Sequence, residues 1–287
     1  MSIEAIVKEF SAVAANPKGQ LKAYKDAGKK CIGVMPYYAP EELVYAAGMM
    51  PFGMWGSNSK TIQRAKEYCA TFYCTIAQLD LEMLLDGTMD LLDGVITPTI
   101  CDTLRPMSQN IRVAMSEKLP CIFLAHPQNR FADFGKQFCM DQYDHVKGEL
   151  EKIAGHEIKS EDIAKAIKVY NKSRAFRTDA SEEGDPMMAL VEQFTNTDYD
   201  VLLYDPQSSK NRRGEFVANL VKESGAQGLV LFMQQFCDPE EMEFPYLKKA
   251  LDAAGIPFIK LGVDQQMRDF GQAATAIQAF ADVLSVQ

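Results

Sequence analysis

The apolar positions of the chain follow two alternating periods, and their order predicts an α/β fold. Short apolar runs that predict buried strands lie at residues 31–38, 94–100, 120–127, 200–206, 228–236 and 256–263, with an extended piece at 49–56. Stretches with the spacing of amphipathic helices lie at residues 3–13, 41–48, 71–87, 102–118, 134–155, 160–176, 187–196, 212–226, 238–254 and 270–284. Strands that alternate with helices require crossover connections, so a mostly parallel sheet is expected.

A polar stretch with Gly and Pro, residues 178–186, divides this pattern into two halves. We expect two domains of the Rossmann-like or flavodoxin-like kind, residues 1–172 and 173–287, with a ligand crevice between them. The second half predicts only three strands, so its sheet is expected to be incomplete.

Composition excludes several classes of protein. The chain is 47% hydrophobic and carries a net charge of -9, and such an acidic balance argues against broad nucleic-acid binding. No stretch approaches the roughly 20 apolar residues that a membrane span requires, and the N-terminus lacks the basic and apolar regions of a signal peptide. We therefore expect a cytoplasmic protein without membrane or nucleic-acid partners. No glycine-rich phosphate loop is present, so nucleotide hydrolysis is not expected.

The chain has seven widely spaced cysteines and no C-x-x-C pair, which predicts reduced thiols or metal ligands rather than disulfides. Cys101 and Cys237 each end a predicted strand and are each followed by an aspartate. After Cys237 the sequence predicts a helix start, with Asp238 as N-cap, Pro239 as the first helical residue and Glu241 placed for a capping box.

Thiols at such corners lie at the carboxyl end of a sheet, where helix N-termini favour the thiolate that binds metals. Cys74, near the start of its predicted helix, could reach the same crevice. The alternative interpretation is that a free cysteine is a small buried apolar residue, and we interpret Cys31, Cys121 and Cys139 in this way. His126 ends a predicted strand, and we favour a hydrogen-bonded structural role over a place in the crevice.

Seven stretches of the chain together resemble the beta-type subunits of the 2-hydroxyacyl-CoA dehydratases. They are GVMPYYAPEELVYAAGMMPFGMWGSN, AKEYCATFYCTIAQ, GVITPTICDTLRPMSQN, LAHPQNR, LLYDP, QQFCDPEEMEFPYLKKALD and GVDQQMRDFGQA. The resemblance implies a hydro-lyase subunit that helps to remove water from a 2-hydroxyacyl-CoA. The expected substrate is (R)-2-hydroxyglutaryl-CoA and the expected product is glutaconyl-CoA.

The resemblance also implies that Cys74, Cys101 and Cys237 each give a thiolate to one 4Fe-4S cluster between the two domains. Cys69 does not fall on a ligand position of the family. The hydrogen at C3 of the substrate is not acidic, so relatives add one electron to the thioester carbonyl, and the resulting ketyl radical expels the hydroxyl group. The cluster of this chain is expected to relay that electron. The implied partners are a homologous alpha subunit, which binds most of the acyl-CoA substrate, and an ATP-dependent iron-sulfur activator; FMN is a candidate second cofactor of the complex.

This sequence departs from the family between Phe176 and Arg177, where relatives carry a further segment that opens the second domain. Two other functions stay open at this point. One is a subunit of the benzoyl-CoA reductase type, which shares the architecture. The other is a non-catalytic partner in a heterodimer that has lost its cluster.

Overall fold

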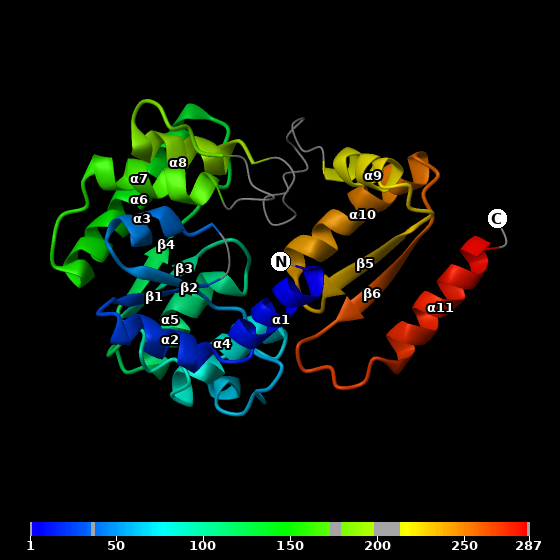
Figure 1. Cartoon of the computed structure of the whole chain (residues 1–287), viewed down its shortest axis with the longest axis horizontal. Helices are drawn as coiled ribbons and strands as arrows, with labels where there is room; N and C mark the ends of the chain where they lie inside the picture. The colour runs from blue at the N-terminus through cyan, green and yellow to red at the C-terminus, as the bar shows by residue number, and fades with distance from the viewer. Residues whose placement is uncertain (1, 36–37, 173–178, 198–212, 286–287) are drawn as a thin grey trace.

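The computed structural model describes residues 2–35, 38–172, 179–197 and 213–285. Within these ranges the strands form two separate sheets, one of four strands and one of two, and every strand pair is parallel. Figure 1 shows each sheet with its own helices, and the two sheets lie on opposite sides of the molecule. The expectation of an α/β fold with mostly parallel strands is therefore confirmed. The expected strand at 200–206 lies outside the described residues.

The first sheet has the strand order β2-β1-β3-β4. Its strands are β1 (Cys31–Val34), β2 (Met50–Gly53), β3 (Gly94–Pro98) and β4 (Cys121–Leu124). The two central strands, β1 and β3, are buried along their whole length, as parallel strands covered on both faces should be.

Successive side chains of the first sheet point to opposite faces and enter two different cores. Ile32 and Ile96 pack against one set of helices, α3 (Glu41–Ala46), α6 (Asp133–Ala154), α7 (Ser160–Asn171) and α8 (Pro186–Thr195). Cys31 and Val95 pack against the other set, α2 (Pro17–Asp26), α4 (Thr75–Leu85) and α5 (Leu104–Ala114). The two sets lie on opposite sides of the sheet in Figure 1. A short 3-10 helix, η1 (Ala65–Glu67), precedes α4.

Helix α8 follows the polar stretch at 178–186 in the sequence, yet its apolar side chains join the core of the first sheet. Leu190 and Val191 are buried there. The boundary between domains at residue 173 stays a prediction, but the packing of α8 belongs with the N-terminal helices.

The second sheet pairs β5 (Leu229–Gln234) with β6 (Phe258–Val263). Figure 1 shows α9 (Arg213–Glu223) and α10 (Asp238–Ala253) on one side of this sheet and α11 (Gly271–Ser285) on the other. Its core is small, with Leu247 and Leu251 of α10 at its centre. Only one residue of β5, Met233, is buried, in contrast to the wholly buried β1 and β3.

Helix α1 (Ile3–Ala14) forms as the sequence predicts, and the Ser2 side chain accepts a hydrogen bond from the backbone N–H of Ala5 at its start. No residue of α1 is buried, and Ile3 and Phe10 are 77% and 70% exposed. Its amphipathic pattern therefore predicts the helix but not a place for it in either core. None of the helices in the described part of the chain is long and apolar enough to cross a membrane.

Candidate metal centre

The three cysteines singled out from the sequence all lie at the N-terminal ends of helices. Cys74 is the N-cap residue of α4 and Cys237 is the N-cap residue of α10. Cys101 lies in the turn that follows β3 and leads into α5, and its carbonyl oxygen accepts a hydrogen bond from the backbone N–H of Arg105. All three side chains are partly buried. Each thiol is thus placed where a helix presents its free N–H groups.

Two expected helix starts are corrected by the structure. The sequence predicted Asp238 as the N-cap of α10, but Asp238 is already helical and Cys237 takes the cap position. The expected capping box with Glu241 is not formed. Instead the neighbouring Glu240 reaches back to accept the backbone N–H of Gln234 at 2.7 Å, because that amide at the end of β5 is not used by the pairing with β6. Helix α4 begins at Thr75 rather than at residue 71, which moves Cys74 from the helix to its end.

Burial and backbone N–H groups shift the pKa values of these thiols in opposite directions. Burial raises the pKa of Cys74 to about 11, and the backbone N–H groups of Ala77 and Ile76 oppose the rise. Burial likewise raises the pKa of Cys237 to about 12, and the backbone N–H of Glu240 opposes it. Without a metal such thiols keep their protons at neutral pH, and a metal that binds them has to displace these protons.

Cys101 has the same environment. Burial raises its pKa, and the backbone N–H groups of Leu104 and Thr103 oppose the rise. All three sulfur atoms are thus approached by backbone N–H groups from the first turn of a helix. Such groups favour thiolates once a metal has replaced the protons.

The three thiols also lie close enough together to affect one another. The charge of Cys101 raises the pKa of Cys74, and the charges of Cys74 and Cys101 raise the pKa of Cys237. The structure therefore brings together residues that are far apart in sequence and come from both sheets. Whether they bind a metal stays a prediction.

The other cysteines do not join this group of three. Cys69 is buried, and burial raises its pKa to about 11; of the other cysteines, Cys74 alone contributes to that shift. Burial is the largest cause that raises the pKa of the three remaining thiols, Cys31, Cys121 and Cys139. No other cysteine contributes to their shifts. Their environments agree with the interpretation of these three as packing residues.

The arrangement of the three cysteines differs from a site for a single metal ion. Within the described ranges, no three His, Cys, Asp or Glu side chains are grouped closely enough to hold one ion. An iron-sulfur cluster has a different requirement, because each thiolate binds its own iron atom and the sulfur atoms can lie further apart. The soft thiolate donors and the surrounding N–H groups fit such a cluster.

Three glutamine side chains join the C-terminal part of the chain to the N-terminal part beside these cysteines; we call them the glutamine bridge. The Nε2 atom of Gln234, at the end of β5, donates to the hydroxyl oxygen of Thr75 at 3.3 Å. Beyond the end of β6, Nε2 of Gln265 donates to the carbonyl oxygen of Trp55 at 2.5 Å, and Nε2 of Gln266 donates to that of Lys60 at 2.8 Å.

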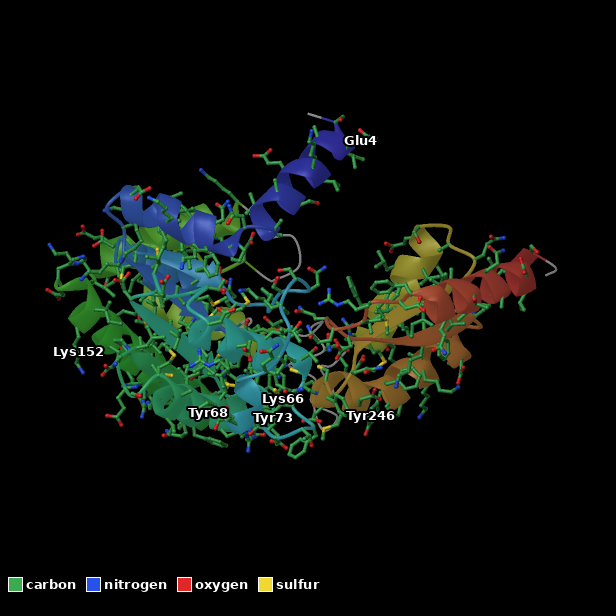
Figure 2. The ribbon with its side chains drawn as sticks, turned by 90° about the horizontal axis from the view of Figure 1, so that it is seen from below. Glu4, Lys66, Tyr68, Tyr73, Lys152 and Tyr246 are labelled. Atoms are coloured by element: carbon green, nitrogen blue, oxygen red, sulfur yellow. The ribbon has the colours of Figure 1, made fainter. Side chains whose placement is uncertain are left out.

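The bridge lies at the carboxyl end of the second sheet, where Gln234 stands three residues before Cys237 along the chain. Figure 2 labels Tyr73, the neighbour of Cys74, on the N-terminal part and Tyr246 of α10 on the C-terminal part. The bridge therefore helps to set the position of Cys237 relative to Cys74 and Cys101.

A buried carboxyl group, Asp80 of α4, lies close enough to Cys74 to affect the pKa of its thiol. Its Oδ1 atom accepts the backbone N–H of Gly56 at 2.7 Å, whereas Oδ2 is buried and has no hydrogen-bond partner among the described residues. Burial raises the pKa of Asp80 to about 8, and a charge on Asp80 raises the pKa of Cys74. The group is thus protonated at neutral pH, which keeps a negative charge away from the thiols.

The structure supports the structural interpretation of His126. Its ring lies 4.6 Å from the ring of Phe194, and its Nε2 atom is 3.1 Å from the carbonyl oxygen of Tyr38. Burial lowers the pKa of His126 to about 4, so the ring is neutral. The sequence did not single out Asp80 or the glutamine bridge, because a helical carboxylate and a few polar residues at strand ends carry no local pattern.

Comparison with known proteins gives relatives over nearly the whole chain. It is 48% identical to the beta subunit of (R)-2-hydroxyglutaryl-CoA dehydratase from Acidaminococcus fermentans, over 99% of this chain and 100% of the relative. It is 32% identical to the beta subunit of (R)-phenyllactyl-CoA dehydratase from Clostridium sporogenes, over 96% of this chain and 98% of the relative. One of the subunits of benzoyl-CoA reductase from Thauera aromatica is 31% identical, over 52% of this chain and 39% of the relative.

The first of these alignments shows that this chain lacks an internal segment. It extends over 379 residues, whereas the chain has 287, so at least 92 aligned positions, the difference between the two, have no counterpart here. The sequence profile described as 2-hydroxyglutaryl-CoA dehydratase, D-component, matches in two pieces, residues 36–182 and 173–284. The pieces overlap at 173–182, which places the missing positions where the sequence departs from its relatives. The profile covers most of the chain, and the chain therefore belongs to the 2-hydroxyglutaryl-CoA dehydratase D-component family.

Proposed function

We propose that the chain is the beta-type subunit of a 2-hydroxyacyl-CoA dehydratase that acts on (R)-2-hydroxyglutaryl-CoA. In this proposal Cys74, Cys101 and Cys237 hold one 4Fe-4S cluster. The observation that carries it is the meeting of these three thiols at three helix N-termini, in a chain of this family. When bound, such a cluster supplies one-electron transfer, which the side chains of a protein do not supply.

The chain's own residues account for how the site is held. The N–H groups of Ala77, Leu104 and Glu240 stabilise negative charge on the three sulfur atoms. The protonated Asp80 adds no charge of its own beside them. The glutamine bridge links the C-terminal part of the chain, which carries Cys237, to the N-terminal part, which carries Cys74 and Cys101.

The proposed complex contains an alpha subunit and an ATP-dependent iron-sulfur activator, with FMN as a candidate second cofactor. The relative from Acidaminococcus fermentans is named as a beta subunit, which supports a partner subunit. With an incomplete set of components the chain is not expected to dehydrate its substrate. The two-domain Rossmann-like arrangement, with the cluster between the domains, belongs to the same proposal.

The experiment combines the chain with its alpha subunit and activator under strict exclusion of oxygen and follows the formation of glutaconyl-CoA. Cys237→Ser should lower the rate at least about tenfold, because loss of even an outer partner of a metal ligand typically costs about 10- to 100-fold. The matched control is Cys121→Ser, because Cys121 is also partly buried, its sulfur contacts Thr97 and the carbonyl oxygen of Ser108, and no other cysteine contributes to the shift of its pKa. Unchanged turnover in Cys237→Ser would contradict the proposal.

One relative supports a second function. The benzoyl-CoA reductase subunit is 31% identical to this chain, close to the 32% of the (R)-phenyllactyl-CoA dehydratase subunit, although the match covers 52% of the chain. Supplying benzoyl-CoA to the same complex tests this function, and ring reduction without dehydration of the hydroxyacyl-CoA would replace our proposal with it. A chain that carries no iron and tolerates all three cysteine substitutions would instead be a non-catalytic partner.

A further inference from the structure

Phe236 has a backbone conformation that bulky residues rarely adopt. Its φ is 61°, in the left-handed region, and it lies between the end of β5 and Cys237. In that region the Cβ atom of an L-residue crowds the following carbonyl oxygen, which costs free energy, and glycine avoids this cost because it has no Cβ atom. A phenylalanine at this position therefore departs from local preference, and such departures concentrate at functional sites.

The turn that contains Phe236 is closed by a backbone hydrogen bond. The N–H of Cys237 donates to the carbonyl oxygen of Gln234 at 3.1 Å. The φ of Gln235 is negative and that of Phe236 is positive, which is the pattern of a type II turn. Such turns normally have glycine or asparagine where this chain has Phe236. The turn leads the chain from β5 into α10 and places Cys237 at the start of the helix.

Hydrogen bonds on both sides keep the turn in this form. Before Phe236, the N–H of Gln235 donates to the carbonyl oxygen of Val263 at 2.8 Å. After it, the N–H of Glu241 donates to the carbonyl oxygen of Cys237 at 3.1 Å. Because the residues on either side are fixed, Phe236 cannot relax to a negative φ without disturbing these contacts.

The side chain of Phe236 gains little from burial that could offset the strain. It is 54% exposed, whereas Met233 of the preceding strand is 7% exposed. A glycine at position 236 would avoid both the left-handed strain and the exposed apolar surface. The stability of the fold by itself therefore does not account for a phenyl ring at this position.

The ring of Phe236 stands beside the partly buried thiol of Cys237. In an extended strand successive side chains point to opposite faces, but a left-handed residue interrupts that alternation, so the ring and the thiol can share a side. A phenyl ring does not ionise or bind iron. Beside a sulfur atom it excludes water and makes an apolar contact. Exclusion of water matters at an iron-sulfur centre, because solvent exposure is one determinant of its reduction potential.

We propose that Phe236 is a positioning residue of the metal centre. Its left-handed backbone directs the phenyl ring over Cys237, and the ring limits the access of water to the sulfur atom. The inference rests on the proposed function, because it assigns the cover to a thiol that holds the cluster. An exposed fraction of 54% agrees with a ring that turns one face to the site and the other to solvent.

The first test needs no metal. In the iron-free chain, Phe236→Gly should make alkylation of Cys237 by iodoacetamide at least about fivefold faster, because the reactivity of a thiol follows its accessibility. Glycine is the residue that fits a φ of 61° best, so this variant keeps the turn and the fold. Phe236→Tyr keeps the ring and should react at the rate of the unaltered chain. Mass spectrometry measures the rate, with Cys101 as the internal reference.

A matched control separates the ring from the relief of strain. Glu117 is exposed and has a φ of 57°, in the turn that leads from α5 into the amino end of β4. Cys101, in contrast, follows the carboxyl end of β3. Glu117→Gly therefore relieves the same kind of strain at the other end of the sheet, and it should leave the alkylation of Cys237 unchanged.

The second test uses the chain purified with its iron in the absence of oxygen. Phe236→Gly should hold as much iron as the unaltered chain, but the reduction potential of its centre should be higher. The reduced centre carries one more negative charge, and contact with water favours the more highly charged form. Phe236→Tyr should keep the potential of the unaltered chain. A redox titration followed by electron paramagnetic resonance measures both.

The proposal is overturned if Phe236→Gly leaves the alkylation rate or the potential unchanged, if Phe236→Tyr behaves like Phe236→Gly, or if Glu117→Gly has the same effect. If Phe236→Gly weakens binding of the alpha subunit without changing alkylation, the ring is an interface residue and the proposal is wrong. An unaltered chain without iron would contradict the proposed function, whereas the alkylation rates would still decide whether the ring covers Cys237.

Discussion

Replacing Asp80 by asparagine tests whether the buried carboxyl group near Cys74 holds a proton. Asp80 is fully buried and accepts one hydrogen bond from Gly56, and its second oxygen has no partner in the part of the chain that the structure describes. Burial raises its pKa from 3.8 to about 8. Asparagine has nearly the same shape, its amide oxygen can accept the same N–H group, and it cannot ionise.

The size of the effect follows from proton linkage. At a pH between 3.8 and about 8, the folded chain keeps a proton on Asp80 that the unfolded chain releases. Unfolding therefore becomes easier as the pH rises. The stability contributed by the protonated group is complete below the unfolded pKa and is lost progressively toward pH 8. A difference of one proton changes the free energy of unfolding by about 1.4 kcal/mol per pH unit. Asp80→Asn should therefore gain about 1.4 kcal/mol relative to the unaltered chain between about pH 6 and about pH 7.

The assay is urea unfolding of the iron-free chain, followed by circular dichroism at about pH 6 and about pH 7. Both values lie above the sequence pI near 5.0, where the chain would tend to precipitate. Asp141→Asn is the control, because Asp141 is exposed on α6 rather than buried. The reasoning is refuted if Asp80→Asn and the unaltered chain differ in free energy of unfolding by the same amount at both pH values. Asp80 would then be ionised in the folded chain.

Two further predictions concern the contact between the two parts of the chain. Gly56 and Gly48 both have positive φ, but a Cβ atom on Gly56 would lie 2.5 Å from Oε1 of Gln265, whereas one on Gly48 would meet nothing within 4 Å. Gly56→Ala should therefore lower the free energy of unfolding by about 1 kcal/mol more than Gly48→Ala, and equal losses in urea unfolding would show that this contact is not tight. Gln266→Ala removes one hydrogen bond of the glutamine bridge, which is worth about 1 kcal/mol. Alkylation of Cys237 in the iron-free chain, followed by mass spectrometry, should therefore become about fivefold faster. An unchanged rate would mean that the bridge does not hold α10.

The sequence predicts the parts of this fold that depend on local pattern. The alternation of apolar runs and helical spacing predicts the parallel strands, and the strand-to-helix corners at Cys101 and Cys237 predict where two thiols lie. Helix α2 was not expected, because its sequence, PKGQLKAYKD, has a single buried residue, Leu21. The sequence predicts the N-cap of α10 one residue too late, because Asp238 is the stronger capping residue by type, whereas Cys237 holds the cap position in the fold.

Other features depend on tertiary contacts that no local pattern shows. Helix α8 was expected beside the second sheet, and its packing on α6 and α7 became visible only in the folded chain. The burial of Asp80 and the partners of the glutamine bridge likewise follow from how the two parts meet. The role of the cysteines in iron binding rests on the family resemblance rather than on spacing.

The most direct test of the central claim is the content of iron and acid-labile sulfide in the chain after purification without oxygen. The account predicts about four atoms of each per chain. It predicts a loss of at least most of both in Cys101→Ser, and no loss in Cys121→Ser, whose thiol lies apart from the other three. A correctly folded chain with no iron, or a Cys101→Ser variant with the full amount, would contradict the account.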